Sequence, residues 1–321
     1  MSEPWYECIS DELAEVDATM DRVLVSDNEE LTEMCRYVIS SGGKRIRPAL
    51  CVLSHYAVGG KDFRRPVEVG SAFEIIHSAT LVHDDINDKG ELRRGRKSLY
   101  RVYTIGKAIV TGDLMFAMGF RLIGATAPEI VDYIVDASAA MGAGEFVQKE
   151  FEHKSEVTPD DYFEIIEGKT AKIFSASAKS GAFLADTDME MVDALGDYAL
   201  ALGKAFQIVD DVLDVTGNSD NTGKTVGLDL IEGKPTLPVI FAMEDPVYGE
   251  KIKEIFETDE PDQSSVDRAI ELILKTDSVE RCMKVASDMM EEAYGYLEIL
   301  EDSVYKRALL NLGEFVIDRD R

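Results

Sequence analysis

The sequence predicts an all-α protein: a single domain of ten or more helices, with its functional site between facing helices. Prolines, which interrupt helices, are absent from residues 67–127 and 160–234. Alternating runs of β-branched residues, which indicate strands, are hard to find. The second proline-free interval instead has apolar residues at the spacing of one helix face, namely Ile165, Ile166, Ala171, Phe174, Ala178 and Phe183.

Loops should separate the helices where glycine, proline or polar runs interrupt the apolar pattern. We expect them near 41–43, 59–62, 89–90, 127–128, 155–159, 216–227, 244–249 and 258–265. No change of composition marks a linker between domains. We therefore expect one domain over residues 1–321, in which residues 1–30 form an N-terminal helical extension.

The composition excludes several classes of protein. Hydrophobic residues make up 45% of the 321 residues, so a disordered chain is excluded. The 62 acidic and 34 basic residues give a net charge of -28, which would repel nucleic acid and anionic membranes. We expect no signal peptide and no transmembrane segment. The cysteines are scattered without a disulfide framework, so we expect a cytoplasmic protein.

Two acidic clusters of the same form each close a long apolar run. Residues i and i+4 share a helix face, about 5–6 Å apart between Cβ atoms, so the first and last aspartates of each cluster repel each other. Mg²⁺, which takes carboxylate oxygens and keeps water and phosphate as its other ligands, would offset that repulsion. The clusters are Asp84, Asp85 and Asp88, and Asp210, Asp211 and Asp214.

Acidic runs also arise by chance in so acidic a chain, and a further one extends from Asp160 to Glu164. It follows Thr158 and Pro159, so its carboxylates fall in the first turn of a helix and stabilise the helix dipole. We interpret this run as structural. The two main clusters close apolar runs instead of opening a helix, so a shared function explains them better than chance.

Basic residues gather at glycine-rich points, and Arg and Lys are the usual partners of phosphate oxygens. The alternative is a network of salt bridges with nearby acids. Together with the acidic clusters, these cations predict a diphosphate held both through metal and directly. His77 lies near the face of Asp84, although a lone histidine on an apolar helix is more often a core residue. The basic groups are Lys44, Arg45 and Arg47; Arg93, Arg94, Arg96 and Lys97; Lys169 and Lys172; Lys224; and Lys234.

An ordered set of motifs resembles the trans-prenyltransferases, or polyprenyl diphosphate synthases, over nearly the whole chain from about Leu31. The resemblance implies an isoprenoid synthase fold, an all-α homodimer with the two aspartate motifs facing each other across a deep central cavity. It implies the Mg²⁺-dependent, head-to-tail condensation of isopentenyl diphosphate with an allylic diphosphate. The motifs are GGKRIRP (42–48), HSATLVHDDIND (77–88), RRG (93–95), AIVTGD (108–113), GEFVQ (144–148), KTA (169–171), FQIVDDVLD (206–214) and GKTVGLDLIEGKPTLP (223–238).

The resemblance also assigns residues by position. The six aspartates would bind Mg²⁺, and they would be catalytic together with Lys169 and Lys224. The allylic diphosphate would be held by Arg93, Lys169, Thr170, Gln207, Lys224 and Lys234. Isopentenyl diphosphate would be held by Lys44, Arg47, His77 and Arg94. The family often continues RRG with a Pro-Thr turn, whereas Arg96, Lys97 and Ser98 follow here, which leaves the geometry of this loop open.

Chain length in this family depends on residues just before the first aspartate motif. Enzymes that stop at fifteen or twenty carbons commonly have an aromatic residue at the position of Ala79, followed here by Thr80. We therefore expect a product longer than twenty carbons. The alternative is a farnesyl or geranylgeranyl diphosphate synthase in which Met115, Phe116 or Phe120 forms the floor of the pocket.

Rival functions remain at this point. A terpene cyclase or a head-to-head prenyl coupler also uses aspartate-rich helices, but neither needs the GGKRIRP site for a second diphosphate. A non-catalytic regulatory subunit should have lost an aspartate cluster or its basic partners, and both are present. The full set of motifs favours the chain-elongating synthase.

Overall fold

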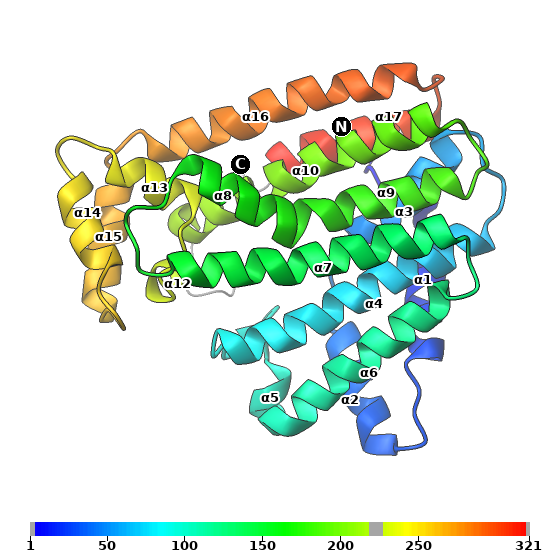
Figure 1. Cartoon of the computed structure of the whole chain (residues 1–321), viewed down its shortest axis with the longest axis horizontal. Helices are drawn as coiled ribbons and strands as arrows, with labels where there is room; N and C mark the ends of the chain where they lie inside the picture. The colour runs from blue at the N-terminus through cyan, green and yellow to red at the C-terminus, as the bar shows by residue number, and fades with distance from the viewer. Residues whose placement is uncertain (1–3, 218–226, 319–321) are drawn as a thin grey trace. The chain divides into compact units, whose positions relative to one another are not determined.

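The computed structural model describes residues 4–217 and 227–318, which are almost entirely helical, as expected (Figure 1). The chain divides into two compact units, which are described separately. Unit 1 contains Met1–Ser138, Ile173–Ala199 and Tyr296–Leu312, and unit 2 contains Ala139–Lys172, Leu200–Gly295 and Gly313–Arg321. The division falls within α7 (Pro128–Phe151), α10 (Met189–Thr216) and α17 (Val304–Ile317). The expected single domain stays a prediction.

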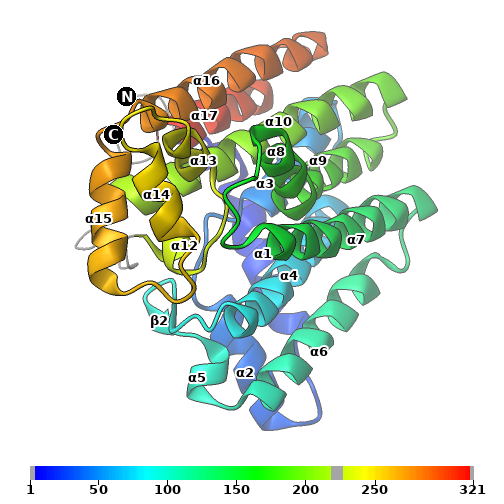
Figure 2. The same ribbon diagram turned by 60° about the vertical axis from the view of Figure 1, so that its left-hand side comes forward.

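Unit 1 is organised around helix α4, which packs against α6, α3 and α1. Its apolar residues are buried on nearly every side, as in a helix at the centre of a core. In Figure 2 a short hairpin lies beyond the C-terminal end of α4, beside α5. The elements are the 3-10 helices Glu7–Ile9 and Leu297–Ile299, α1 (Ser10–Val23), α2 (Glu29–Ile39), α3 (Ile46–Ala57), α4 (Arg64–Asn87), β1 (Leu92–Arg93), β2 (Arg96–Lys97), α5 (Leu99–Val102), α6 (Ile105–Ile123) and α9 (Lys172–Phe183).

Glycines in α6 allow it to approach α4 closely. A Cβ atom added at Gly119 would lie 2.7 Å from Cγ1 of Ile76, and one at Gly112 would lie 2.3 Å from Nε2 of His83. Larger side chains would therefore push the two helices apart. This contact positions the C-terminal half of α4, which contains the first aspartate cluster.

Unit 2 contains the second aspartate cluster, on the C-terminal half of α10. Its first complete helix, α8, begins with the capping box of Thr158 and Asp161 and with Pro159 in its first turn. The structural interpretation of the acidic run at 160–164 is therefore confirmed for Asp161. The elements are α8 (Pro159–Ile166), a π-helix (Glu167–Ala171), α12 (Leu228–Ile231), α13 (Leu237–Met243), α14 (Gly249–Phe256), α15 (Gln263–Ile273) and α16 (Ser278–Tyr296).

The observed elements differ from the expected ones in two places. The helix expected from residue 160 onward is interrupted by the π-helix Glu167–Ala171, between α8 and α9. The β1–β2 hairpin was not expected, since each strand has only two residues. Among the described helices, none is long and apolar enough to cross a membrane.

Candidate active site

The first aspartate cluster lies at the C-terminal end of α4, where the helix stops. Asp85 is buried, with 5% of its surface exposed, whereas Asp84 and Asp88 are half-buried. The backbone N–H of Asp88 donates to the carbonyl of Asp84 at 2.8 Å, so the last turn of the helix holds these two residues on one face. The middle carboxylate therefore points into the protein, and the outer two keep accessible surface.

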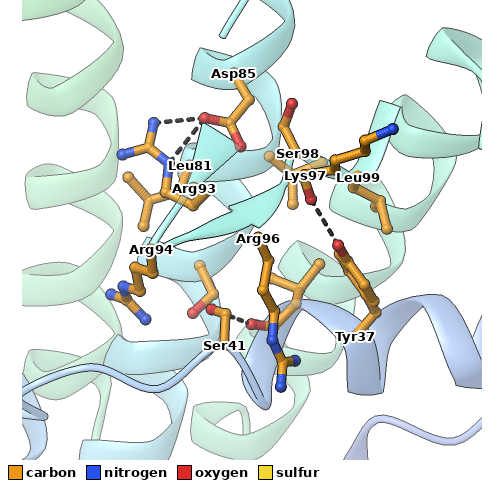
Figure 3. A pocket seen from close by; sticks show the side chains of 13 residues that line it. Tyr37, Ser41, Leu81, Asp85, Arg93, Arg94, Arg96, Lys97, Ser98 and Leu99 are labelled. Atoms are coloured by element: carbon orange, nitrogen blue, oxygen red, sulfur yellow. Dashed lines mark hydrogen bonds and ion pairs between the residues drawn. The ribbon is translucent and has the colours of Figure 1, made fainter. Parts of the chain in front are cut away.

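The hairpin after α4 holds Asp85 in place. Arg94 and Gly95 both have positive φ, 52° and 76°, as a two-residue turn with this hand requires. The turn directs Arg93 toward α4, where its Nε and Nη2 atoms donate to Oδ1 of Asp85 at 2.8 and 2.5 Å (Figure 3). Burial raises the pKa of Asp85, and the Arg93 guanidinium opposes that rise. The RRG motif thus supplies the counter-ion of the middle aspartate.

A pocket lined by Arg93, Arg94, Arg96 and Lys97 opens between this hairpin, α2 and α4 (Figure 3). Arg94 donates through Nη1 to the carbonyl of Gly42, in the glycine pair before Lys44. Arg96 donates to Oγ of Ser40 at 3.1 Å, and the hydroxyl of Tyr37 donates to the carbonyl of Lys97 at 2.7 Å. The loop whose geometry Arg96, Lys97 and Ser98 left open is therefore a hairpin, which hydrogen bonds tie to the end of α2.

Arg47 and His77 are half-buried side chains of unit 1 that lie near each other. Nε of Arg47 and Nδ1 of His77 are buried without a hydrogen-bond partner. Burial lowers the pKa of Arg47 to about 10, and burial beside Arg47 and Arg94 lowers the pKa of His77 well below its usual value. The partly buried charge of Arg47 and the unused polar atoms of both side chains suit an anionic ligand. Of the other residues expected here, Lys44 is exposed.

Glu74, which the sequence analysis missed, partly balances these cations. Its carboxylate is 2% exposed and accepts a hydrogen bond from Nη1 of Arg45 at 2.9 Å. Arg45 also pairs with Asp17 at 2.9 Å. The signal in the sequence was a charged residue inside the apolar run 72–76, three positions before His77.

The second aspartate cluster repeats the arrangement of the first. Asp211 is buried, with 4% exposed, while Asp210 and Asp214 are half-buried. Both oxygens of Asp211 accept hydrogen bonds, from the Tyr162 hydroxyl at 2.7 Å and from Nε2 of Gln207 at 2.8 Å. The backbone N–H of Asp229 donates to Oδ2 of Asp214 at 3.2 Å. In each cluster, neutral or cationic donors hold the middle aspartate, and the outer two share one helix face.

Lys169 lies in the π-helix, a rare element that often occurs at functional sites. The π-helix and α7 approach closely through two glycines: a Cβ atom at Gly144 would lie 2.7 Å from the backbone nitrogen of Lys169, and one at Gly168 would lie 2.9 Å from the Ala140 carbonyl. Nζ of Lys169 lies 3.3 Å from Oε1 of Gln148. Gly144 of the GEFVQ motif therefore allows α7 and the π-helix to lie close together, and Gln148 of the same motif contacts Lys169.

The other residues expected to bind diphosphate are Thr170, Gln207, Lys224 and Lys234. Thr170 donates to Oε1 of Gln207 at 2.9 Å, so both of these residues are linked to Asp211. Lys234 follows α12 and pairs with Glu232 at 2.5 Å. Lys224 lies outside the described residues. That the clusters of the two units bind one diphosphate from opposite sides stays a prediction.

The donor set fits Mg²⁺ better than a metal held by protein alone. Within residues 4–217 and 227–318, no group of three or more His, Cys, Asp or Glu side chains is arranged to hold a metal ion. The half-buried carboxylates instead come as two pairs at i and i+4, Asp84 with Asp88 and Asp210 with Asp214. Mg²⁺ typically binds to one or two carboxylates and completes its shell with water and substrate phosphates.

The two expected chain-length residues differ in exposure. Ala79 is completely buried, whereas Thr80 is half-buried and lies one turn before Asp84 on the same face. Met115 is also fully buried, and Phe116 and Phe120 are half-buried. Thr80 is therefore the member of the pair with accessible surface near the aspartate cluster.

Comparisons with known proteins identify the family of the chain. The family model described as polyprenyl synthetase matches residues 28–273. An all-trans-nonaprenyl-diphosphate synthase (geranyl-diphosphate specific) from Rhodobacter capsulatus is 34% identical over 316 residues, covering 97% of this chain and 96% of its own. A geranylgeranyl diphosphate synthase from Methanosarcina mazei is 33% identical over 319 residues, covering 97% of each chain.

A solved structure extends the likeness to three dimensions. The polyprenyl synthase from Caulobacter crescentus, complexed with calcium and isoprenyl diphosphate, has a TM-score of 0.94 at 30% identity, covering 99% of this chain and 97% of that chain. With aspartate and arginine motifs arranged as described above, the chain belongs to the polyprenyl synthetase family of prenyltransferases.

Proposed function

We propose that this protein condenses isopentenyl diphosphate with an allylic diphosphate, head to tail and with Mg²⁺, to give a trans-polyprenyl diphosphate longer than twenty carbons. The observation that carries the proposal is the repeated design of the two aspartate clusters. In each, a buried middle aspartate is held by hydrogen bonds, and two outer carboxylates one turn apart remain half-buried. Such pairs suit a metal that shares its shell with phosphate.

Two different sets of residues would bind the two diphosphate substrates. Asp84, Asp88, Asp210 and Asp214 would hold Mg²⁺, while Asp85 and Asp211 keep the clusters in position. When bound, Mg²⁺ stabilises the negative charge that develops on the departing diphosphate. The allylic diphosphate is also held by the side chains of Arg93, Lys169, Thr170, Gln207, Lys224 and Lys234.

Isopentenyl diphosphate is held by the basic groups of unit 1, namely Lys44, Arg47, His77 and Arg94. The allylic C–O bond breaks, and the double bond of isopentenyl diphosphate attacks the resulting cation to form the new C–C bond. The departing diphosphate takes the proton that the product loses, and it is released as the second product. Apolar walls must keep water from the cation, because water would capture it. No side-chain nucleophile takes part.

The expected product length depends on small residues near the first cluster. Ala79 and Thr80, five and four positions before Asp84, are both small residues without an aromatic ring. The relatives include both a nonaprenyl and a geranylgeranyl diphosphate synthase, so family membership alone does not set the length. We therefore base the longer product on these two residues.

The experiment is to incubate the purified chain with isopentenyl diphosphate, Mg²⁺ and a panel of allylic diphosphates, and to size the products by chromatography. We expect products longer than twenty carbons, and none when isopentenyl diphosphate or Mg²⁺ is left out. A product from the allylic diphosphate alone would indicate a cyclase or a head-to-head coupler. A chain that is inactive by itself would indicate a regulatory subunit. Products of fifteen or twenty carbons would support the shorter-chain alternative.

The aspartate clusters are tested separately by substitution. Asp84→Ala or Asp210→Ala should lower turnover by orders of magnitude, because each removes a carboxylate from the proposed metal site. The circular dichroism of both variants should match that of the original protein, since these half-buried side chains contribute little to the core. Near-normal turnover in either variant would remove the metal assignment.

We further propose that the protein is a homodimer in the cytoplasm. Helix α6 exposes apolar side chains on one face, with Ile105 54%, Ile109 41% and Val110 54% exposed. Three exposed apolar side chains on one helix of so acidic a protein suit contact with a second copy of the chain. Light scattering should give twice the chain mass of 35.5 kDa, and Ile109→Lys should give the monomer. The described cysteines are free thiols, which suits a reducing compartment.

A further inference from the structure

Tyr162 lies on the inner face of α8, a helix whose acidic first turn has a structural role. The capping box at Thr158 and Asp161 sets where α8 begins, and Tyr162 is the next residue. Its side chain is 2% exposed and shares a buried face with Ile165 and Ile166. A buried tyrosine needs a partner for its hydroxyl. That partner is Oδ2 of Asp211, at 2.7 Å.

Asp211 depends on this contact more than Tyr162 does. A buried carboxylate is more costly to leave without donors than a buried hydroxyl is. Its other oxygen, Oδ1, accepts from Nε2 of Gln207 at 2.8 Å, and Gln207 in turn accepts from Thr170 at 2.9 Å. The carboxylate is therefore held from two sides, by α8 and by the preceding turn of α10.

The position of Asp211 affects its neighbours on the same helix. Asp210 and Asp214 lie one residue before it and three residues after it, and both are half-buried. Each oxygen of the buried Asp211 side chain accepts one hydrogen bond, so these two donors together fix its orientation. Loss of the Tyr162 donor would let Asp211 turn, and the last turns of α10 would shift with it.

We propose that Tyr162 is a positioning residue for the metal site, which acts through Asp211 to aim the carboxylates of Asp210 and Asp214. This role rests on the proposed function, in which these two carboxylates hold Mg²⁺. A hydrogen-bond donor that touches neither metal nor substrate can still affect metal affinity, because it helps to orient the side chains that bind the metal. Replacement of such partners typically lowers metal affinity or activity by about 10- to 100-fold.

The test compares Tyr162→Phe with a matched control, Tyr198→Phe. Tyr198 is fully buried, and its hydroxyl donates to the carbonyl of Leu309 at 2.5 Å, so both variants lose one hydroxyl and one buried hydrogen bond. Two quantities are measured for each: the Mg²⁺ concentration for half-maximal turnover, and the affinity for Mn²⁺ by electron paramagnetic resonance with inorganic diphosphate present. Melting temperature is recorded alongside.

We expect Tyr162→Phe to weaken both metal measurements by roughly tenfold or more. Tyr198→Phe should leave both unchanged while lowering the melting temperature by a similar amount. Incorporation of 3-fluorotyrosine at position 162 keeps the hydroxyl and should retain the original affinity. Equal metal dependence in Tyr162→Phe and the unmodified protein would overturn the positioning role, as would equal weakening in the Tyr198 control. An unmodified chain that makes no product would instead overturn the proposed function, independently of the Mn²⁺ result.

Discussion

Thr80→Phe should change the length of the product, whereas Ala79→Phe should mainly lower the stability of the protein. The two residues are adjacent, but Thr80 is half-buried and Ala79 has no exposed surface. Four residues of helix place Thr80 about 6 Å along the axis from Asp84, on the same face. A phenyl ring there would extend into accessible space beside the aspartates, so Thr80→Phe should shorten the product by one or more isoprene units.

The same ring at Ala79 would enter a closed core. Overpacking of this kind costs about 1–3 kcal/mol. An unfolding entropy of about 2.1 cal/mol/K per residue amounts to about 0.7 kcal/mol per degree for the 321-residue chain. Ala79→Phe should therefore lower the melting temperature by about 1.5–4.5 °C, and Thr80→Phe by less.

Two assays separate these effects: chromatographic sizing of the product, and thermal unfolding followed by circular dichroism. The alcohols released from the products of each variant are compared with those of the unmodified protein. Our reasoning would be refuted if Ala79→Phe shortened the product without a loss of stability while Thr80→Phe left the product unchanged. The pocket floor would then lie on the other face of α4.

The remaining predictions concern stability. Arg93→Met removes both donors from buried Asp85 and should lower the free energy of unfolding by about 2 kcal/mol in urea titrations; a loss below about 0.5 kcal/mol would contradict the pairing. The net charge of -28 makes the acidic side chains repel one another, and salt screens this repulsion. The melting temperature should therefore rise as salt shortens the Debye length from about 30 Å to below 8 Å, and a constant melting temperature would contradict the repulsion. The pKa of His77 is lowered by folding, so the unfolded chain binds a proton that the folded chain does not, and stability should fall below about pH 6.5. His77→Gln should reduce that fall in urea titrations at successive pH values, and an identical pH dependence would contradict the assignment.

The helices and the aspartate clusters could be predicted because their signals are local. An apolar run with aspartates at i and i+4 predicts a helix with two carboxylates on one face, and the ends of α4 and α10 have that form. The family motifs likewise marked Arg93 and Lys169, which the structure places beside Asp85 and Gln148.

The partners of the middle aspartates could not be predicted, because they are distant in sequence. Nothing near Tyr162 indicates that its hydroxyl reaches Asp211, and the helix around it looked purely structural. The β1–β2 hairpin was missed because two-residue strands leave no alternating pattern. The positive φ angles of Arg94 and Gly95 that set the direction of Arg93 are a property of the folded turn. Such contacts depend on tertiary packing.

A crystal structure of the protein with Mg²⁺ and an unreactive allylic diphosphate analogue would test the central claim most directly. We predict metal ions that bridge the phosphate oxygens to carboxylates of both clusters, Asp84 and Asp88 with Asp210 and Asp214, at about 2.0–2.1 Å. A diphosphate bound away from either cluster, or clusters that face bulk solvent on different sides of the molecule, would contradict it.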